Sequence, residues 1–509
     1  MEKRTLLAIT ISVAILIVYQ YFFAKQAAPP QPAPGKGAVQ ETTPSPSPAP
    51  LPSRAAVPAE SAEKAKDVTV ENELFTAVLT TRGGALKSVS LKHYKDKDGK
   101  PIVLKGDGAA LPLSLGVDDG FQFSAVAFSV SGGDIRLTPG QKTASLVFEY
   151  ASEGYSLRRT YTFHNDAYGF DLKDEVKGTP SYWITLGRDF GIYHKDDSVH
   201  FGPVILKDAD RIEYKVKDLK EPKSLKDGIK WIAEEDKYFF SALVPRTPVE
   251  EVKVWSKDGE AVAAMRMPAG SSSYLVYAGP KEHDRLKRWG VGLEHIVDFG
   301  FFSIIARPLF WVLKFFYSIF RNYGVAIIIL TVLVRIPFIP LINKGQASMK
   351  KLQAIQPKMT EIREKYKNDP QRMQQELMGI YKKHKVNPMG GCLPMLLQIP
   401  VFFALYKVLL VSIELRGAPF LLWVQDLSAK DPYYILPIVM GITMVIQQKM
   451  TPSTVDPTQQ KLMMIMPVVF TFMFLSFPSG LVLYWLVNNV LSIAQQMYAN
   501  KKAAKEAAA

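Results

Sequence analysis

Cysteine is almost absent from this 509-residue chain, in which Cys392 is the only thiol. One cysteine excludes an intramolecular disulfide and any zinc or iron–sulfur site built from several thiolates. The seven histidines show no metal-ligand spacing, and the sequence lacks the motifs of P-loop nucleotide binding, serine hydrolases and helical zinc proteases. We therefore expect no cofactor, no metal and no enzymatic activity.

Acidic side chains are missing from the long apolar segments towards the C-terminus. No Asp or Glu occurs in residues 393–413, 433–448, 462–477 or 481–498. Proton and ion relays inside membranes usually need several titratable groups in series. We also find no inverted repeat of the kind on which many transporters are built. Both absences argue against a coupled solute transporter.

Positive charge is abundant instead, with 62 Lys and Arg against 48 Asp and Glu and a net charge of +14. A basic chain can bind nucleic acid, but membrane proteins also concentrate Lys and Arg on the cytoplasmic side. Residues 344–388 hold eleven Lys or Arg and only four Asp or Glu. We attribute the charge to a cytoplasmic segment and expect no specific nucleic-acid partner.

The N-terminus combines a basic head with an apolar run of nineteen residues, 6–24. A cleaved signal peptide is one interpretation, but its apolar core usually spans about 7 to 15 residues. We expect an uncleaved transmembrane anchor at 1–25 with its N-terminus in the cytoplasm. Residues 26–66 are rich in proline and poor in large apolar side chains, which predicts an extended linker.

Alternating apolar and polar residues indicate strands over residues 67–295. In SLVFEY the apolar positions are Leu146, Phe148 and Tyr150, and YSLRRTYTF repeats the pattern. Turn signals such as RGG, KDGKP and SGGD separate the runs, which favours an antiparallel sandwich. We expect one large all-β domain outside the cytoplasm.

The rest of the chain predicts a polytopic α-helical membrane protein. Residues 296–320 are aromatic but carry Arg307, Pro308 and Lys314, as in an amphipathic helix lying in the membrane interface. The expected order is then a second transmembrane helix at 321–343, a cytoplasmic helical hairpin at 344–388, four transmembrane helices within 389–500 and a short cytoplasmic tail at 501–509. With the anchor this makes six spans and places both termini in the cytoplasm.

The segment TVLVRIPFIPL places Arg335 about eight residues from the inner end of its span, or roughly 12 Å along a helix. A guanidinium in hydrocarbon costs about 2.5 to 3.5 kcal/mol on insertion scales. The side chain either snorkels to the headgroups as an anchor or faces a water-filled cavity. Thr331, Gln398, Asn488 and Asn489 could line such a cavity, although singly each is more often a helix–helix hydrogen-bonding group. Without an acid partner in the spans, a cation exposed to water is favoured.

Three stretches carry a resemblance to a known family: NPMGGCLPMLLQIPVFFALYKVL (387–409), SAKDPYYILPIVMGITMVIQQKM (428–450) and FPSGLVLYWLVNN (477–489). They closely resemble the YidC/Oxa/Alb family of membrane protein insertases, and the order of anchor and outer domain is similar to a Gram-negative-type YidC. The resemblance implies a multi-pass protein of the bacterial inner membrane, with a five-helix insertase core and a periplasmic β-supersandwich. Over the β domain the resemblance is weaker and is limited to the position of the domain in the chain and its size.

The resemblance also implies a hydrophilic groove that is open to the cytoplasm and to lipid, with Arg335 as its functional cation and Thr331 beside it. Tyr484 and Trp485 match aromatic residues that face arriving substrates, although the family often has Tyr at the position of Trp485. The predicted substrate groove further includes Gln398 and Asn488. A slide for a substrate helix is implied at Leu396, Phe402, Leu405, Met463, Met466 and Phe470.

The implied function is to insert and help fold integral membrane proteins, alone or with the Sec translocon. The implied partners are nascent membrane proteins, membrane lipids and, through the cytoplasmic hairpin, the ribosome or the signal recognition machinery. The tail KKAAKEAAA is short beside the basic tails through which many relatives bind ribosomes. A membrane transporter and a membrane-anchored carbohydrate-binding protein are the alternatives, and the sequence of the β domain leaves the second open.

Overall fold

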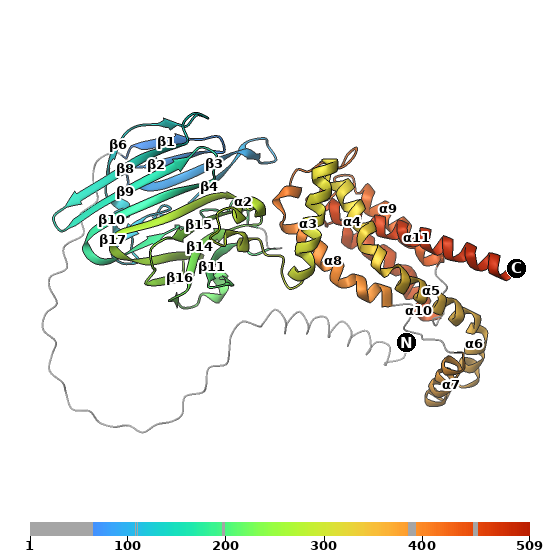
Figure 1. Ribbon diagram of the computed structural model, residues 1–509. Helices are drawn as coiled ribbons and strands as arrows, with labels where there is room; N and C mark the ends of the chain where they lie inside the picture. Colours follow the sequence, from blue (N-terminus) through green and yellow to red (C-terminus); the bar gives the residue numbers. More distant parts are fainter. Residues whose placement is uncertain are drawn as a thin grey trace, which may run out of the picture. The chain divides into compact units, whose positions relative to one another are not determined.

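The computed structural model describes residues 65–106, 108, 110–195, 199–384, 393–450 and 457–508. Within these ranges the side chains of 393–397, 457–463 and 502–508 are not described. The predicted anchor at 1–25 and nearly all of the predicted linker at 26–66 lie outside the described residues. The described residues form a β region and, after it in the chain, a helical region (Figure 1).

The β region begins with a five-stranded sheet in the order β4-β3-β2-β1-β7. Its strands are β1 (Asp67–Glu71), β2 (Phe75–Thr80), β3 (Ala85–Lys95), β4 (Pro101–Lys105) and β7 (Ile135–Arg136). The pairs are antiparallel except for β1 and β7, which run parallel. The predicted antiparallel character therefore holds for this sheet apart from one short edge pair.

A second sheet of twelve strands runs in the order β12-β11-β14-β15-β17-β10-β9-β8-β6, with β5, β13 and β16 attached beside it. Its two longest strands, β10 (Gly169–Thr185) and β17 (Glu260–Pro280), pair at its centre. The others are β5 (Leu115–Gly116), β6 (Ser129–Ser131), β8 (Thr143–Ser152), β9 (Tyr155–His164), β11 (Gly202–Lys207), β12 (Asp210–Glu213), β13 (Lys223–Leu225), β14 (Ile229–Glu235), β15 (Phe239–Pro245) and β16 (Glu251–Lys257).

The core of the β region lies between the two sheets. Along β9 every second residue from Tyr155 to Phe163 is buried, as the alternation predicts. Phe75 of the smaller sheet packs edge-on against Phe163 of the larger one, with ring centroids 6.4 Å apart. The predicted all-β domain is confirmed. The inner face of β9 also contains a charged residue, Arg159.

The helical region follows the β region in the chain. Its helices are α3 (Ser303–Phe320), α4 (Tyr323–Arg335), α5 (Ile339–Ala354), α6 (Gln356–Lys365), α7 (Pro370–Lys383), α8 (Leu393–Val411), α9 (Ile435–Met450), α10 (Pro457–Phe474) and α11 (Ser479–Ala508), after a short α2 (His283–Lys287). Helix α11 contacts α4 on one side and α9 on another (Figure 1). This arrangement places polar residues of α11 beside α4.

Two helices in the described part of the chain are long and apolar enough to cross a membrane, Ser303–Phe320 and the continuous stretch Tyr323–Ala354. Gln398–Val411, Ile435–Met450 and Met464–Phe474 are shorter apolar helices. The count of six spans therefore stays a prediction. So does the interfacial placement of α3, because by length and composition this helix also qualifies as a span.

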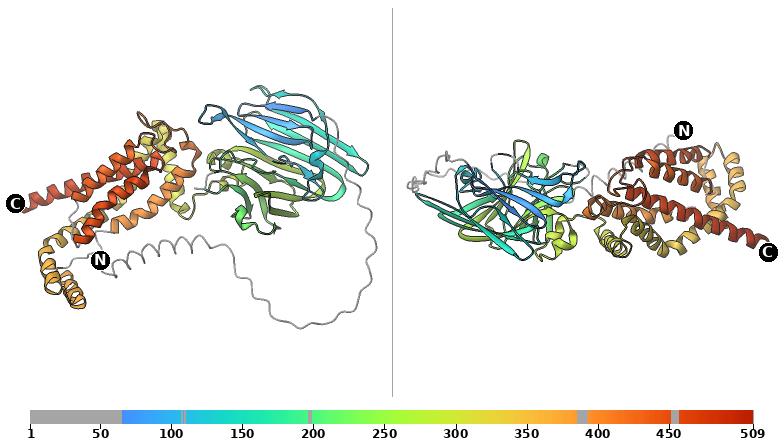
Figure 2. Two further views of the ribbon diagram at one scale, coloured as in Figure 1. Left: turned by 180° about the vertical axis from the view of Figure 1, so that it is seen from behind. Right: turned by 90° about the horizontal axis from the view of Figure 1, so that it is seen from above.

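The predicted span that contains Arg335 does not end at its prolines. After α4 the backbone tightens into one 3₁₀ turn, Ile336–Phe338, and continues directly into α5. Proline tolerates these positions because each lies near the first turn of a new helical segment, where its missing N–H is not needed. Beyond α5, the helices α6 and α7 lie side by side (Figure 2). Asp369 caps α7 by accepting a hydrogen bond from the Arg372 N–H.

Candidate functional site

Arg335, the last residue of α4, is half-buried and directs its guanidinium to α11. Its Nη1 donates to the carbonyl oxygen of Asn488 at 3.3 Å and to Asn488 Oδ1 at 2.7 Å. Its Nη2 donates to Ser492 Oγ at 3.0 Å and to Gln495 Oε1 at 3.1 Å. All four acceptors are neutral, and no ion pair among the described residues involves Arg335. The charge is solvated by the protein without being neutralised.

A small cavity adjoins this cation. Its volume is about 30 Å³, which is room for about two water molecules, since one needs roughly 10–15 Å³. Residues of α4, of the 3₁₀ turn that follows it, and of α5, α8 and α11 line it: Thr331, Val334, Arg335, Phe338, Ile342, Gln398, Val401, Tyr484 and Asn488. Its polar groups and its cation make it a place where water can be held.

Five of the six predicted groove residues meet at this cavity: Arg335, Thr331, Gln398, Tyr484 and Asn488. The Thr331 hydroxyl donates to the Ile327 carbonyl of its own helix at 2.7 Å, so its oxygen can still accept. Asn489 lies elsewhere and donates to Thr443 Oγ1 of α9 at 3.1 Å. For Asn489 the helix–helix interpretation is the one that the geometry matches.

Trp485, the sixth predicted groove residue, lies outside the lining of the cavity. Its ring packs against Phe402 of α8 and against Phe470 and Phe474 of α10, with centroid distances of 5.1, 6.1 and 5.3 Å. Two residues of the predicted slide, Phe402 and Phe470, therefore belong to one aromatic cluster with Trp485. This cluster joins α8, α10 and α11.

The other predicted slide residues differ in their surroundings. Leu405 is buried at 1% exposure, so it contacts a substrate only if the bundle rearranges, whereas Met466 is 40% exposed on α10. Leu396 and Met463 lie in α8 and α10, and their side chains are outside the described part. An exposed apolar surface is thus available on α10 but not at Leu405.

Two functional candidates were missed from the sequence, Ser492 and Gln495. They follow Asn488 at intervals of four and three residues, and this spacing places all three side chains on one face of a helix. The signal was therefore present in the sequence. Depth in the predicted span does not single them out, because both lie towards the end of the apolar segment 481–498.

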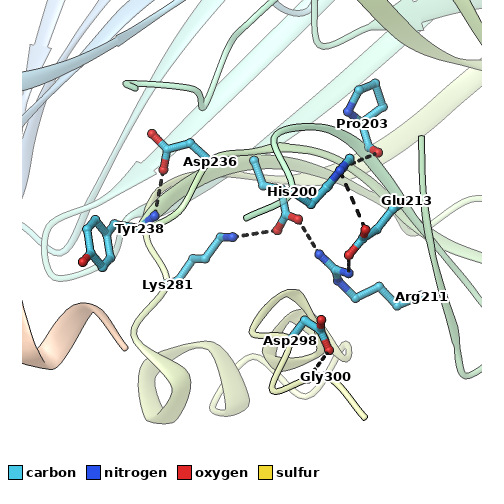
Figure 3. Close-up of polar contacts among 10 residues, drawn as sticks. His200, Pro203, Arg211, Glu213, Asp236, Tyr238, Lys281, Asp298 and Gly300 are labelled. Atoms are coloured by element: carbon cyan, nitrogen blue, oxygen red, sulfur yellow. Dashed lines mark hydrogen bonds and ion pairs between the residues drawn. The ribbon is translucent and has the colours of Figure 1, made fainter. Parts of the chain in front are cut away.

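A second group of charges, which is only partly buried, lies in the β region (Figure 3). Arg211 of β12 donates to both Glu213 and Glu235, and Lys281 Nζ donates to Glu235 Oε2 at 2.7 Å. His200 Nδ1 is 3.8 Å from Glu213 Oε2, and burial lowers the pKa of His200. Burial alone would raise the pKa of Glu213, but the neighbouring basic groups, Arg211 foremost, together lower it. Two cations balance two carboxylates, so the group is compensated internally.

Over the described residues, no group of three or more His, Cys, Asp or Glu side chains is arranged to hold a metal ion. Arg335 is half-buried beside a cavity and has no carboxylate partner among the described residues, and we take this cavity as the candidate site.

Comparisons with known proteins agree over both regions. Residues 67–312 match the family model described as the YidC periplasmic domain, and residues 315–506 match the model described as 60Kd inner membrane protein. The membrane protein insertase YidC of Syntrophus aciditrophicus strain SB is 46% identical over 482 residues, covering 88% of this chain and 87% of the relative. That of Geotalea daltonii is 45% identical over 472 residues, covering 88% and 89%.

Among solved structures, a crystal structure of an active YidC insertase with its first transmembrane domain resolved is 20% identical. It covers 86% of this chain and 94% of its own, with a TM-score of 0.41. The family models and the two relatives together extend over nearly all of both regions. The chain therefore belongs to the YidC family of membrane protein insertases.

Proposed function

We propose that the cavity at Arg335 is the closed end of a hydrophilic groove through which this insertase moves polar segments of its substrates. One observation supports this most directly: the guanidinium is held by four neutral acceptors beside a space for water. A cation that is solvated but not neutralised keeps its attraction for an arriving anion. The groove would open towards the cytoplasm and sideways to lipid.

The physical problem of insertion is the passage of polar groups through about 30 Å of hydrocarbon. Each backbone group without a hydrogen-bond partner costs several kcal/mol there. A watered path that reaches Arg335 shortens the dry part of the passage. Burial of the substrate's apolar span in lipid, at about 25 cal/mol per Å², can drive the process without nucleotide hydrolysis, aided by the membrane potential where the moving segment is negative.

Arg335 would favour acidic segments. A hydrogen bond from a guanidinium to a carboxylate is roughly twice as strong as one between neutral groups. An Asp or Glu of the substrate can therefore replace Asn488 as the acceptor of Nη1. When the segment moves on, Asn488 is in place to accept again, which lets the substrate leave. A partner acid in the protein would block this exchange.

The apolar part of a substrate would move along α8 and α10. The exposed side chain of Met466 and the aromatic cluster around Trp485 offer it an adaptable surface, because thioether and ring contacts tolerate many shapes. Phe402 and Phe470 belong to this surface in the proposal. Leu405 would join it only after α8 has shifted.

The chain is an inner-membrane protein with a periplasmic β domain, and the finer topology belongs to the proposal. We expect six spans, both termini in the cytoplasm and the hairpin α6–α7 also in the cytoplasm, because the basic residues concentrate in 344–388. Nascent membrane proteins would be the substrates. The Sec translocon, and the ribosome or signal recognition machinery acting at the hairpin, are proposed as further partners.

The proposal is tested with substrates that differ only in charge. Purified full-length protein is reconstituted in vesicles, and insertion is compared for a small membrane protein whose translocated segment carries Asp and for its Asp→Asn version. Arg335→Ala should lower insertion of the acidic version by roughly tenfold, the factor of one lost charge-assisted hydrogen bond. Arg335→Lys should retain much of it, because the charge is kept.

The neutral substrate is the internal control. If Arg335→Ala inserts both versions as fast as the wild type, Arg335 has no part in translocation and the proposed groove cation is wrong. If both versions fail equally, Arg335 supports the fold and not the choice of substrate. Crosslinking of a ribosome-bound nascent chain to a probe at Tyr484 then tells whether substrates reach the cavity at all.

A further inference from the structure

Helix α11 holds the guanidinium of Arg335 through a stripe of three polar residues. Asn488 lines the cavity, whereas Ser492 and Gln495 lie beyond it. Helical rise puts Gln495 about 10 Å further along α11 than Asn488. Nη1 is bound to Asn488, and Nη2 to both Ser492 and Gln495. The two ends of the guanidinium therefore have different partners.

The partners of Nη2 are themselves fixed. The Ser492 hydroxyl donates to the Asn488 carbonyl at 2.8 Å, which leaves its lone pairs free to accept from Arg335. Gln495 donates through Nε2 to Asn343 Oδ1 of α5 at 2.7 Å, so its amide oxygen faces Arg335. Neither acceptor can turn away without losing a bond of its own.

These hydrogen bonds matter because an arginine without them could adopt another conformation. Its long side chain can extend to the inner membrane surface and leave the cavity. Two acceptors on Nη2 fix the plane of the guanidinium and keep Nη1 beside Asn488. An arriving carboxylate then displaces one neutral acceptor while the other end of the group stays in place.

We propose that Ser492 and Gln495 are positioning residues that hold Nη2 of Arg335, so that Nη1 faces the cavity and selects acidic substrate segments. The inference rests on the proposed function of the cavity and adds the residues that set its charge selectivity. They act through Arg335 and do not contact the substrate. Their neutrality is part of this positioning role, because a carboxylate at either position would pair with the cation.

The test measures selectivity in addition to rate. Full-length variants are reconstituted in vesicles, and the ratio of insertion for the Asp-bearing and Asn-bearing substrates is compared with the wild type. Ser492→Ala combined with Gln495→Leu should lower this ratio by roughly tenfold, towards unity, as for the loss of a hydrogen bond to a charged group. Gln495→Glu should lower it too, by supplying a permanent partner, and Ser492→Thr should preserve it by keeping the hydroxyl.

Gln496 provides the matched control. It is the next residue of α11 and the same type, but its Nε2 donates to Asn500 Oδ1 at 3.2 Å and not to α4. Gln496→Leu should leave the ratio unchanged. A purely structural role of Ser492 and Gln495 predicts that both substrates slow equally, with the ratio preserved. That result would overturn the inference.

The same assay separates this inference from the function on which it rests. If Arg335→Ala lowers the ratio and the double variant does not, the groove cation stands and the positioning role is wrong. If Arg335→Ala leaves the ratio unchanged, the proposed function itself fails. Should the double variant fail to assemble in vesicles, Gln495→Glu gives the deciding measurement alone, because its side chain is nearly the same size.

Discussion

The β region and the helical region each remove an arginine from bulk water, and they do so in opposite ways. Arg159 of β9 and Asp174 of β10 face each other across the strand pair, and both side chains are 0% exposed. Nε and Nη2 donate to the two carboxylate oxygens at 2.8 and 3.1 Å, and Nη1 donates to two carbonyls, Gly84 and Leu113. Arg335 has only neutral acceptors and a cavity beside it.

We propose that the difference separates a charge used for structure from a charge that can bind a ligand. Burial raises the pKa of Asp174 although Arg159 opposes the shift, so the pair is stable only as a unit. Because the Asp174 carboxylate accepts two hydrogen bonds from Arg159, exchange for another partner would be unfavourable. The amide and hydroxyl oxygens around Arg335 bind more weakly, and an anion can replace them. Burial of a cation does not by itself indicate function; the chemistry of its acceptors does.

The largest effect is expected at the structural pair. Arg159→Met leaves Asp174 buried without a partner, and breaking a buried ion pair from one side costs about 3–5 kcal/mol. The free energy of unfolding of the β domain should fall by that amount, measured on the full-length protein by urea unfolding with pulse proteolysis.

Arg158 supplies the control, because it carries the same charge on the outer face of β9, where its side chain is 54% exposed and pairs with Glu149. Arg158→Met should cost less than about 1 kcal/mol. Equal losses in the two variants would mean that Arg159 stabilises through charge in general and not through its buried pair. Combining Arg159→Met with Asp174→Leu should recover part of the loss, since no lone charge remains.

A smaller effect is expected from the compensated group around His200. The ordinary pKa of histidine is 6.5, and in the fold burial lowers the pKa of His200, with Arg211 also opposing a second cation while Glu213 and Glu235 favour it. The unfolded chain therefore takes up a proton first. Stability should fall as pH drops below 6.5 and level off once the pH is below the folded pKa.

His200→Gln removes this proton uptake, so the stability advantage of the wild type over the variant should shrink between pH 8 and pH 5.5. Hydrogen exchange of β11 and β12 in the full-length protein measures it locally. His164→Gln controls for the substitution itself, because His164 lies on β9, outside the group around His200, and its side chain is 31% exposed. A constant difference for His200→Gln across this range would show that His200 does not titrate between the two states.

The two arginines also show which features of the structure can be predicted from the sequence alone. Strand alternation predicted the β fold, and in YSLRRTYTF it also places Arg159 on the buried face, between Leu157 and Tyr161. Hydropathy identified Arg335, and the polar residues at depth identified Thr331, Gln398 and Asn488. These are local signals, each set by a period of 2 or 3.6 residues.

Other features depend on contacts between distant residues. The pairing of β10 with β17 joins strands some ninety residues apart, and nothing in either strand specifies its partner. For the same reason the acceptors of Arg335 could not be assigned, because helical spacing shows that Asn488, Ser492 and Gln495 share a face but not that the face meets α4. Trp485 was predicted to lie in the groove, but its ring lies in an aromatic cluster and not at the cavity.

The smallest stability effect is expected where the functional effect is largest. Arg335→Met removes four hydrogen bonds, but Ser492 and Gln495 keep their bonds to the Asn488 carbonyl and to Asn343, and Asn488 faces a cavity that can admit water. No buried charge is left behind. The thermal unfolding of the helices in detergent, followed by circular dichroism, should report a loss below about 1 kcal/mol. If Arg335→Met destabilises the helices by as much as Arg159→Met destabilises the β domain, both arginines serve to stabilise the fold. The neutral acceptors would then have no bearing on exchange with a substrate.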